Sequence, residues 1–83
     1  MSRQATRHIK SIVGGNIRSA RDASGLTQRE LGARVNDMDS INVSRWERAQ
    51  VMPSAASMVA LAEALGRDVA WFYTDHEPER EAA

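Results

Sequence analysis

Residues 40–48 carry side chains of the kinds that recognise nucleic acids. If this segment is a helix, with about 100° between successive residues, Val43 and Trp46 lie on one side of it. The opposite side then carries Ile41, Ser44, Arg45 and Arg48. A guanidinium can donate two hydrogen bonds to guanine, a hydroxyl adapts to different base edges, and an apolar group can contact the methyl group of thymine. The same side chains also suit an ordinary solvated helix face, so their surroundings have to discriminate between the two interpretations.

Two helices are predicted before this segment. Over residues 9–23, apolar side chains recur at steps of three and four, as they do on one face of an α-helix. A second helix begins after Thr27, because Thr27 and Glu30 have the spacing of a capping box. Asn36 and Asp37 follow as turn residues that tolerate a left-handed backbone.

Capping signals also divide the second half of the chain. Asp39 is the predicted N-cap of a third helix over residues 40–48. Pro53 and Ser54 open a fourth helix, which ends at Gly66. A short fifth helix over residues 69–73 follows Asp68 as its N-cap.

The predicted fold class is all-α, with five helices in one domain. No segment alternates apolar and polar residues for long enough to be a strand. We expect a flexible basic arm over residues 1–8, a folded domain over residues 9–74 and an acidic tail over residues 75–83. The stretch Gly14-Gly15-Asn16 lies inside the first helix and is not followed by the Lys-Ser/Thr of a phosphate loop, so we expect it to permit close packing of helices.

Charge is unevenly distributed along the chain, although 11 basic and 11 acidic side chains cancel. Residues 1–50 contain nine Arg or Lys and five Asp or Glu, whereas residues 51–83 contain two and six. A basic half beside an acidic half favours a face that attracts an anion such as nucleic acid. A chance scatter of charges is the alternative when this feature is taken alone.

Several other classes of function find no support. The chain has no cysteine, which excludes disulfides, thiolate zinc sites and a cysteine nucleophile. His8 and His76 lie at opposite ends without an obvious partner, so we expect no metal site. No motif indicates a cofactor or an active site, and we expect that the protein is not an enzyme. No apolar run could span a membrane and no signal peptide is recognisable, which predicts a cytoplasmic protein.

Four motifs, in this order, resemble the Cro/Xre-type helix-turn-helix family of phage and bacterial repressors, whose domain is lambda-repressor-like. The motifs are Leu26-Thr-Gln-Arg-Glu-Leu31, Val43-Ser-Arg-Trp-Glu-Arg48, Pro53-Ser54 and Leu61-Ala-Glu-Ala-Leu65-Gly66. The resemblance covers about residues 15–73. It implies that the second helix lies across the DNA backbone and that the third enters the major groove of double-stranded DNA.

The resemblance also implies roles for individual residues. The base-reading positions are matched by Ser40, Ile41, Ser44 and Arg45, and Asn42 can reach a base or a backbone oxygen. The phosphate-contact positions are matched by Gln28, Arg48 and Gln50, which would fix the register of the protein on DNA. Among these residues, Arg45 is expected to contribute most to base discrimination, about 1–3 kcal/mol.

Arg21 and Glu47 match a pair that forms an ion pair in similar proteins. There is an independent reason to expect it, because Glu47 lies near the inward side of the third helix and a buried carboxylate needs a partner. We expect this pair to be structural, and Trp46 to belong to the core.

Three departures from the family pattern lie around the third helix. The turn before it is one residue longer than usual, which leaves the assignment of Ser40 and Ile41 open by one position. Asn36 stands where the family's turn has Gly, and Ala49 stands where Gly is common.

The aromatic run at the end of the predicted domain indicates a partner surface. Three consecutive aromatic side chains cannot all face one small core, so Phe72 is expected inside and Trp71 or Tyr73 at the surface. In similar proteins the C-terminal helix often makes a two-fold dimer. Trp71 and Tyr73 are therefore candidates for a dimer interface.

We therefore predict a small transcriptional repressor or regulator that binds double-stranded DNA as a homodimer on a pseudo-palindromic operator. A phage Cro-like or immunity repressor is favoured, and a restriction–modification controller or an antitoxin fits nearly as well. The alternative is a protein-interaction module that has lost DNA affinity and binds a partner through its aromatic patch. Asp37, Asp39 and the zero net charge favour that alternative, whereas Gln28, Arg45 and Arg48 oppose it.

Overall fold

The computed structural model describes the backbone of residues 2–76 and the side chains from His8 onward. Its five helices are α1 (Ser2–Ala23), α2 (Gln28–Arg34), α3 (Ser40–Glu47), α4 (Ala55–Leu65) and α5 (Val69–Phe72). This part of the chain contains no strand, and the predicted all-α, five-helix fold is confirmed. None of the described helices is long and apolar enough to cross a membrane.

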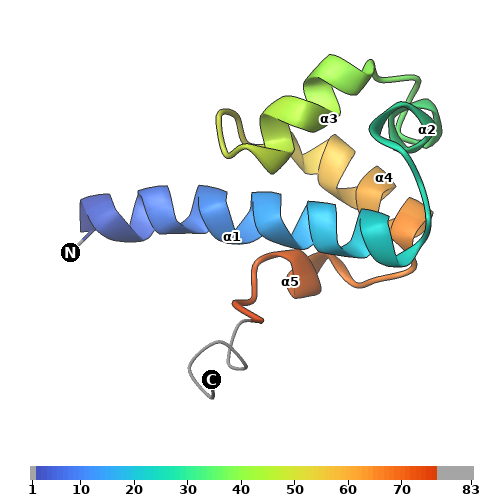
Figure 1. Ribbon diagram of the computed structural model, residues 1–83. Coiled ribbons are helices and arrows are strands. Elements are labelled where there is room, and N and C mark those ends of the chain that lie inside the picture. Colours follow the sequence, from blue (N-terminus) through green and yellow to red (C-terminus); the bar gives the residue numbers. More distant parts are fainter. Residues whose placement is uncertain (1, 77–83) are drawn as a thin grey trace.

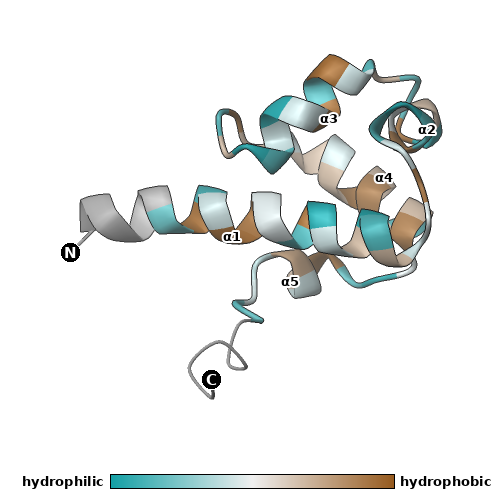
Figure 2. Ribbon diagram, in the orientation of Figure 1, coloured by the Kyte–Doolittle hydropathy of each residue, from teal (hydrophilic) through white to brown (hydrophobic). Residues whose placement is uncertain are grey.

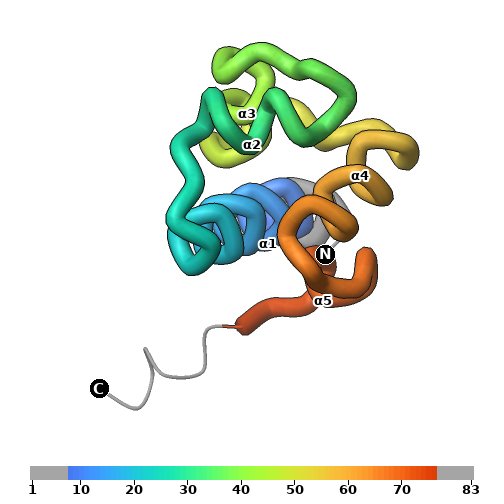
Figure 3. Tube along the Cα trace, turned by 90° about the vertical axis from the view of Figure 1, so that its right-hand side faces the viewer, coloured from blue at the N-terminus to red at the C-terminus, as the bar shows by residue number. Residues whose placement is uncertain are grey.

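The long helix α1 runs through the middle of the domain (Figure 1). Helices α2, α3 and α4 lie on one side of it and the short α5 on the other. The view along α1 shows α2 and α3 together above this helix, with α5 below it (Figure 3). The predicted recognition helix and the aromatic C-terminal segment are therefore on opposite sides of α1.

Helix α1 starts earlier than the apolar periodicity predicts. The periodic pattern begins at Ile9, but the helix begins at Ser2. The backbone of residues 2–8, where we expected an arm, is therefore helical. No Gly or Pro interrupts residues 2–8, so nothing in the sequence stops the helix from continuing back from Ile9 to Ser2. Of the predicted acidic tail, residues 77–83 lie outside the described part.

Side-chain caps define two of the helix starts. In the predicted capping box, the Glu30 amide donates to Thr27 Oγ1 at 3.0 Å, and the Thr27 amide donates to Glu30 Oε1 at 2.8 Å. Ser54 caps α4 by accepting the Ser57 amide at 3.1 Å. Asp39 and Asp68 occupy the N-cap positions of α3 and α5, but their side chains make no capping hydrogen bond.

The core gathers one apolar stripe from each helix. The residues that are buried there are Val13, Ile17, Ala20, Leu31, Val35, Val43, Trp46, Met58, Leu61, Ala62, Leu65 and Phe72. Brown and pale colours predominate along α4, which lies against the other helices (Figure 2). Each large aliphatic side chain buried in this way stabilises the fold by about 1.5–3 kcal/mol relative to an exposed one.

Two glycines let helices approach more closely than any other residue would permit. A Cβ on Gly14 would clash with the carbonyl oxygen of Trp46, and a Cβ on Gly32 would clash with that of Met38. Gly14 therefore sets the distance between α1 and α3, whereas Gly15, which we had grouped with it, meets no atom within 4 Å. Gly32 lets the turn before α3 pack directly on α2.

Sequence reasoning missed Asn16, a buried polar side chain on the inner face of α1. Its Nδ2 atom donates to the carbonyl oxygens of Phe72 at 2.9 Å and Thr74 at 2.8 Å, and makes a longer contact of 3.3 Å with that of Trp71. These carbonyls lie at the end of α5, where no helical partner remains for them. Asn16 thus fastens α5 to α1. The sequence held one sign of this role: Asn16 is a polar residue on the helix face that Val13, Ile17 and Ala20 make apolar.

Candidate nucleic-acid interface

Helix α3 presents a polar face on the side away from the core. Val43 and Trp46 are buried, as the helical periodicity predicts, whereas Ile41 remains 58% exposed. Arg45 and Arg48 are exposed as well, and Ser40, Asn42 and Ser44 are half-buried. The structure therefore gathers all five predicted base-reading side chains on one short helix. An exposed isoleucine between polar residues is what contact with a base edge would use.

The longer turn places its extra residue before α3 rather than inside it. Asn36 and Asp37 both have a left-handed backbone, with φ of 54° and 56°. Met38 then returns toward the core, and its amide donates to the Gly32 carbonyl at 2.8 Å. Because Asp39 remains the N-cap, α3 begins at Ser40. The extra residue therefore leaves the continuous helix from Ser40 to Glu47 undisturbed, and the base-reading roles of Ser40 and Ile41 stay predictions.

At the other end of α3 the chain also turns through a left-handed residue. Ala49 has a φ of 63°, at the position where Gly is common in the family. The Gln50 amide donates to the Arg45 carbonyl at 2.9 Å and closes the helix end. The side chains of Arg48 and Gln50, the two predicted phosphate contacts at this end, are both exposed.

The structure joins Arg21 and Glu47 as a two-pronged ion pair. Arg21 Nε lies 2.6 Å from Glu47 Oε2, and Arg21 Nη2 donates to Glu47 Oε1 at 3.0 Å. The Glu47 side chain is only 4% exposed and that of Arg21 12%. The hydrogen bond to Glu47 raises the pKa of Arg21 above its ordinary value, so the guanidinium stays charged. Removing one partner from such a pair leaves an uncompensated buried charge.

The same carboxylate holds Gln28, which sequence reasoning placed at a DNA phosphate. Gln28 Nε2 donates to Glu47 Oε1 at 3.0 Å, and the Gln28 side chain is half-buried. No local sequence signal predicts this contact, because the two residues are 19 positions apart. Gln28 therefore has a partner within the domain before any DNA is present.

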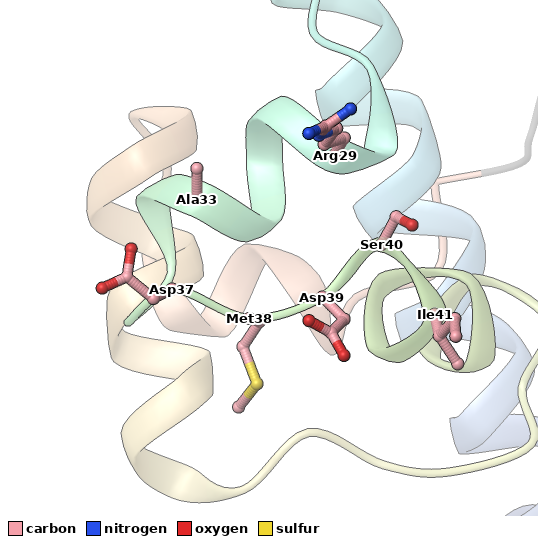
Figure 4. Close-up of a pocket in the computed structure, with 7 residues that line it drawn as sticks. All are labelled: Arg29, Ala33, Asp37, Met38, Asp39, Ser40 and Ile41. Carbon is pink, nitrogen blue, oxygen red and sulfur yellow. The ribbon is translucent and has the colours of Figure 1, made fainter.

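An open hollow of about 410 Å³ lies between α2 and the start of α3. It is lined by Arg29, Ala33, Asp37, Met38, Asp39, Ser40 and Ile41. Figure 4 shows Arg29 on α2 at one side and the carboxylates of Asp37 and Asp39 on the turn. Since Asp39 does not use its side chain to cap α3, its charge remains beside the proposed base-reading residues. Sequence reasoning had not singled out Arg29, an exposed cation in the first turn of α2.

The two aromatic candidates for a dimer interface differ in their environment. Trp71 is half-buried and stacks on His76, with ring centroids 4.5 Å apart. The Arg67 guanidinium lies 4.1 Å from the Trp71 ring centroid, and Phe72 packs edge-on at 5.1 Å. Tyr73, by contrast, is 41% exposed. Tyr73 is therefore the more exposed of the two candidates among the described residues.

Comparisons with known proteins agree with this geometry. A family model described as helix-turn-helix matches residues 17–72. An uncharacterised HTH-type transcriptional regulator of Rickettsia conorii is 35% identical over 65 residues, which cover 78% of this chain and 51% of the relative. This chain thus spans about half the length of the curated relatives it matches, since a second from Rickettsia prowazekii is covered to 49%.

Solved structures show the same arrangement of helices. The P22 c2 repressor in complex with a synthetic operator has a TM-score of 0.72 and 27% identity, covering 76% of this chain and 94% of the repressor chain. A hypothetical transcription factor from Neisseria has a TM-score of 0.77 over 90% of this chain and 85% of its own. Its 21% identity shows the likeness of fold alone.

Proposed function

The chain belongs to the helix-turn-helix family of DNA-binding transcriptional regulators of the Cro/C1 type, and from this premise we propose that it is a sequence-specific repressor. In this proposal α3 lies in the major groove and reads base edges, while α2 crosses the DNA backbone. Binding alone, without a cofactor or a catalysed reaction, occludes a promoter. The site of action is the cytoplasm, where bacterial DNA is found.

The observation that carries the proposal is the outward face of α3. Ile41 is 58% exposed although an equally apolar position, Val43, is completely buried two residues later. Arg45 is exposed one turn further along, on the same side as Ser44. A helix that leaves an apolar side chain and a guanidinium free beside each other suits a groove with donors, acceptors and methyl groups.

The proposal extends to individual contacts. We assign base contacts to Ser40, Ile41, Asn42, Ser44 and Arg45. Phosphate contacts are assigned to Gln28, Arg48 and Gln50, which sequence reasoning also proposed. Arg48 is the charged member of this second group. Its loss should therefore reduce the salt dependence of the binding affinity by the amount expected for one phosphate contact.

A homodimer on a pseudo-palindromic operator extends the proposal. Tyr73 is 41% exposed at the C-cap of α5, and α5 lies on the other side of α1 from α3, so a second copy packed against it would leave the recognition helix uncovered (Figure 1). A phage-type repressor is the setting we favour, because the P22 c2 repressor bound to its operator is similar over 76% of this chain. Two-fold symmetry would place the half-sites about one helical turn of DNA apart.

The test is selection of the purified protein against a random double-stranded DNA library, with Arg45→Ala in parallel. We expect an enriched inverted repeat whose guanine preference relaxes in the variant, because Arg45 loses about 1–3 kcal/mol of discrimination. A motif unchanged by Arg45→Ala would contradict the assigned register. No enrichment at low salt would overturn the regulator function and favour a protein partner bound at Tyr73.

A further inference from the structure

The carboxylate of Glu47 accepts a hydrogen bond from Gln28 in addition to the two that form its ion pair with Arg21. Two hydrogen bonds from Arg21 already neutralise the charge in a two-pronged geometry. A third hydrogen bond comes from Gln28 Nε2 at 3.0 Å. Glu47 is the last residue of α3 and Gln28 the first residue of α2, so one buried side chain joins the two helices proposed to touch DNA.

This contact decides how the Gln28 side chain is turned. A carboxylate only accepts hydrogen bonds, so Gln28 has to present its NH2 group and not its carbonyl oxygen. In an unconstrained glutamine the two orientations are nearly equivalent in shape and interchange. With one N–H of Nε2 on Glu47, the second N–H of the same nitrogen has a defined direction. Gln28 is half-buried and its contact with Glu47 is only partly buried, so the side chain is not closed off from an external acceptor.

We propose that Glu47 is a positioning residue for DNA binding, which holds the Gln28 carboxamide so that its second N–H donates to a DNA phosphate. This inference rests on the proposed function, because it takes the phosphate contact of Gln28 as given. Arg21 is a positioning residue too. An unpaired Glu47 carboxylate beside a phosphate would repel it, and the bound guanidinium cancels that charge.

The arrangement also keeps the two kinds of DNA contact in register. Glu47 follows the base-reading residues on the same helix, so any shift of α3 would carry the Gln28 amide with it. Arg21 holds Glu47 from the last turn of α1, and its Nη1 also donates to the Leu26 carbonyl at 2.9 Å, just before α2. Hydrogen bonds thus connect the proposed phosphate donor to the helix that carries the proposed base-reading residues before DNA is bound.

A double-mutant cycle tests the inference on the operator selected above. The dissociation constants of the wild type, Gln28→Ala, Glu47→Gln and the double variant are measured by fluorescence anisotropy, at a temperature where circular dichroism shows all four to be folded. Gln28→Ala should weaken binding about tenfold, the value of one hydrogen bond to a charged acceptor. Glu47→Gln should weaken binding to a similar extent in the wild type but hardly at all in the Gln28→Ala background.

Two controls separate positioning from general effects. Glu47→Gln raises the net charge by one. Glu63 is an exposed carboxylate on α4, so Glu63→Gln makes the same change in charge without altering the contacts among Arg21, Gln28 and Glu47. It should not weaken binding. Because Gln28 is neutral, Gln28→Ala should leave the salt dependence of binding unchanged, whereas Arg48→Ala should lower its slope by about 0.9.

A measurement on the wild type keeps the inference testable if Glu47→Gln does not fold. The two Nε2 protons of Gln28 are followed by NMR as operator DNA is added. One should already be protected in the free protein, and the other should shift on binding. An equal loss from Glu47→Gln in both backgrounds, or the absence of any shift at Gln28, would overturn the inference. A wild type that binds no DNA would overturn the proposed function itself, which is a different and recognisable outcome.

Discussion

Helix α1 is joined to α3 by charged side chains and to α5 by a neutral one. On the α3 side, Arg21 and Glu47 meet at 2.6 Å, almost completely shielded from solvent. On the α5 side, the Asn16 amide donates to backbone carbonyls at 2.8 and 2.9 Å. We call the Arg21–Glu47 ion pair the charged joint and the hydrogen bonds of Asn16 the neutral joint. The charged joint depends on two particular side chains. The neutral joint needs only one, because every residue supplies a backbone carbonyl. Helix α3, the proposed recognition helix, is therefore held by the ion pair, which costs more free energy to break.

The largest expected effect comes from breaking the charged joint. Glu47→Ala leaves Arg21 buried without its partner and should lower the free energy of unfolding by about 3–5 kcal/mol. That is a large part of the total for a small domain, about 5–15 kcal/mol. Urea denaturation followed by circular dichroism measures the loss. Glu63→Ala, an exposed site on α4, is the matched control and should change stability by no more than about 0.5 kcal/mol.

Two adjacent glycines on α1 test the packing at the same joint. Gly14→Ala places a Cβ against the carbonyl oxygen of Trp46 and should destabilise the protein by about 1–3 kcal/mol. Gly15→Ala meets no atom within 4 Å and should stabilise it by about 0.5–1 kcal/mol, because Ala favours a helix. Thermal melts of the two variants should shift in opposite directions. Shifts of the same sign would show that α1 and α3 are not in this close contact.

Breaking the neutral joint should have a smaller and more local effect. Asn16→Ala removes the donor for the Phe72 and Thr74 carbonyls and should cost about 1–2 kcal/mol, since water can reach part of this helix end. Amide hydrogen exchange should rise at α5 and remain unchanged at α3. Equal loosening of both helices would contradict the division into two separate joints.

The smallest effect concerns the capping box that starts α2, close to the charged joint. The hydrogen bond from the Thr27 amide lowers the pKa of Glu30 below its ordinary value. A carboxyl whose pKa is lowered in the folded state stabilises that state above its unfolded pKa, and the contribution disappears as the pH falls through the folded value. The difference in melting temperature between the wild type and Glu30→Gln should therefore be present at neutral pH and vanish in acid. A constant difference across that range would show that the carboxylate is not the group involved.

Some predictions from sequence hold because they depend on close neighbours. The capping box joins residues three apart, and the buried side of α3 follows from helical periodicity between Val43 and Trp46. The left-handed turn residues Asn36 and Asp37 were also recognisable from their types. The pairing of Arg21 with Glu47 lies further along the chain, and only the resemblance to a family suggested it. The base and phosphate contacts themselves stay predictions, which the selection experiment tests.

Other features needed the folded chain. Local signals made Asp39 a capping side chain and residues 1–8 an arm, and the structure shows an uncapped N-cap and a helix that begins at Ser2. An N-cap preference does not say whether the carboxylate turns toward the helix amides, and apolar periodicity gives no signal in a segment as polar as residues 2–8. Both depend on what surrounds the segment.

The amino-acid sequence by itself determined the number and order of the five helices in the described part of the chain, and the outward face of α3, because each depends on residues within a few positions of one another. Only the tertiary structure decided that Gln28 is held by Glu47 and that Asn16 fastens α5. These partners are 19 and 56 positions apart, and a hydrogen bond over such a separation exists only after packing has brought the helices together.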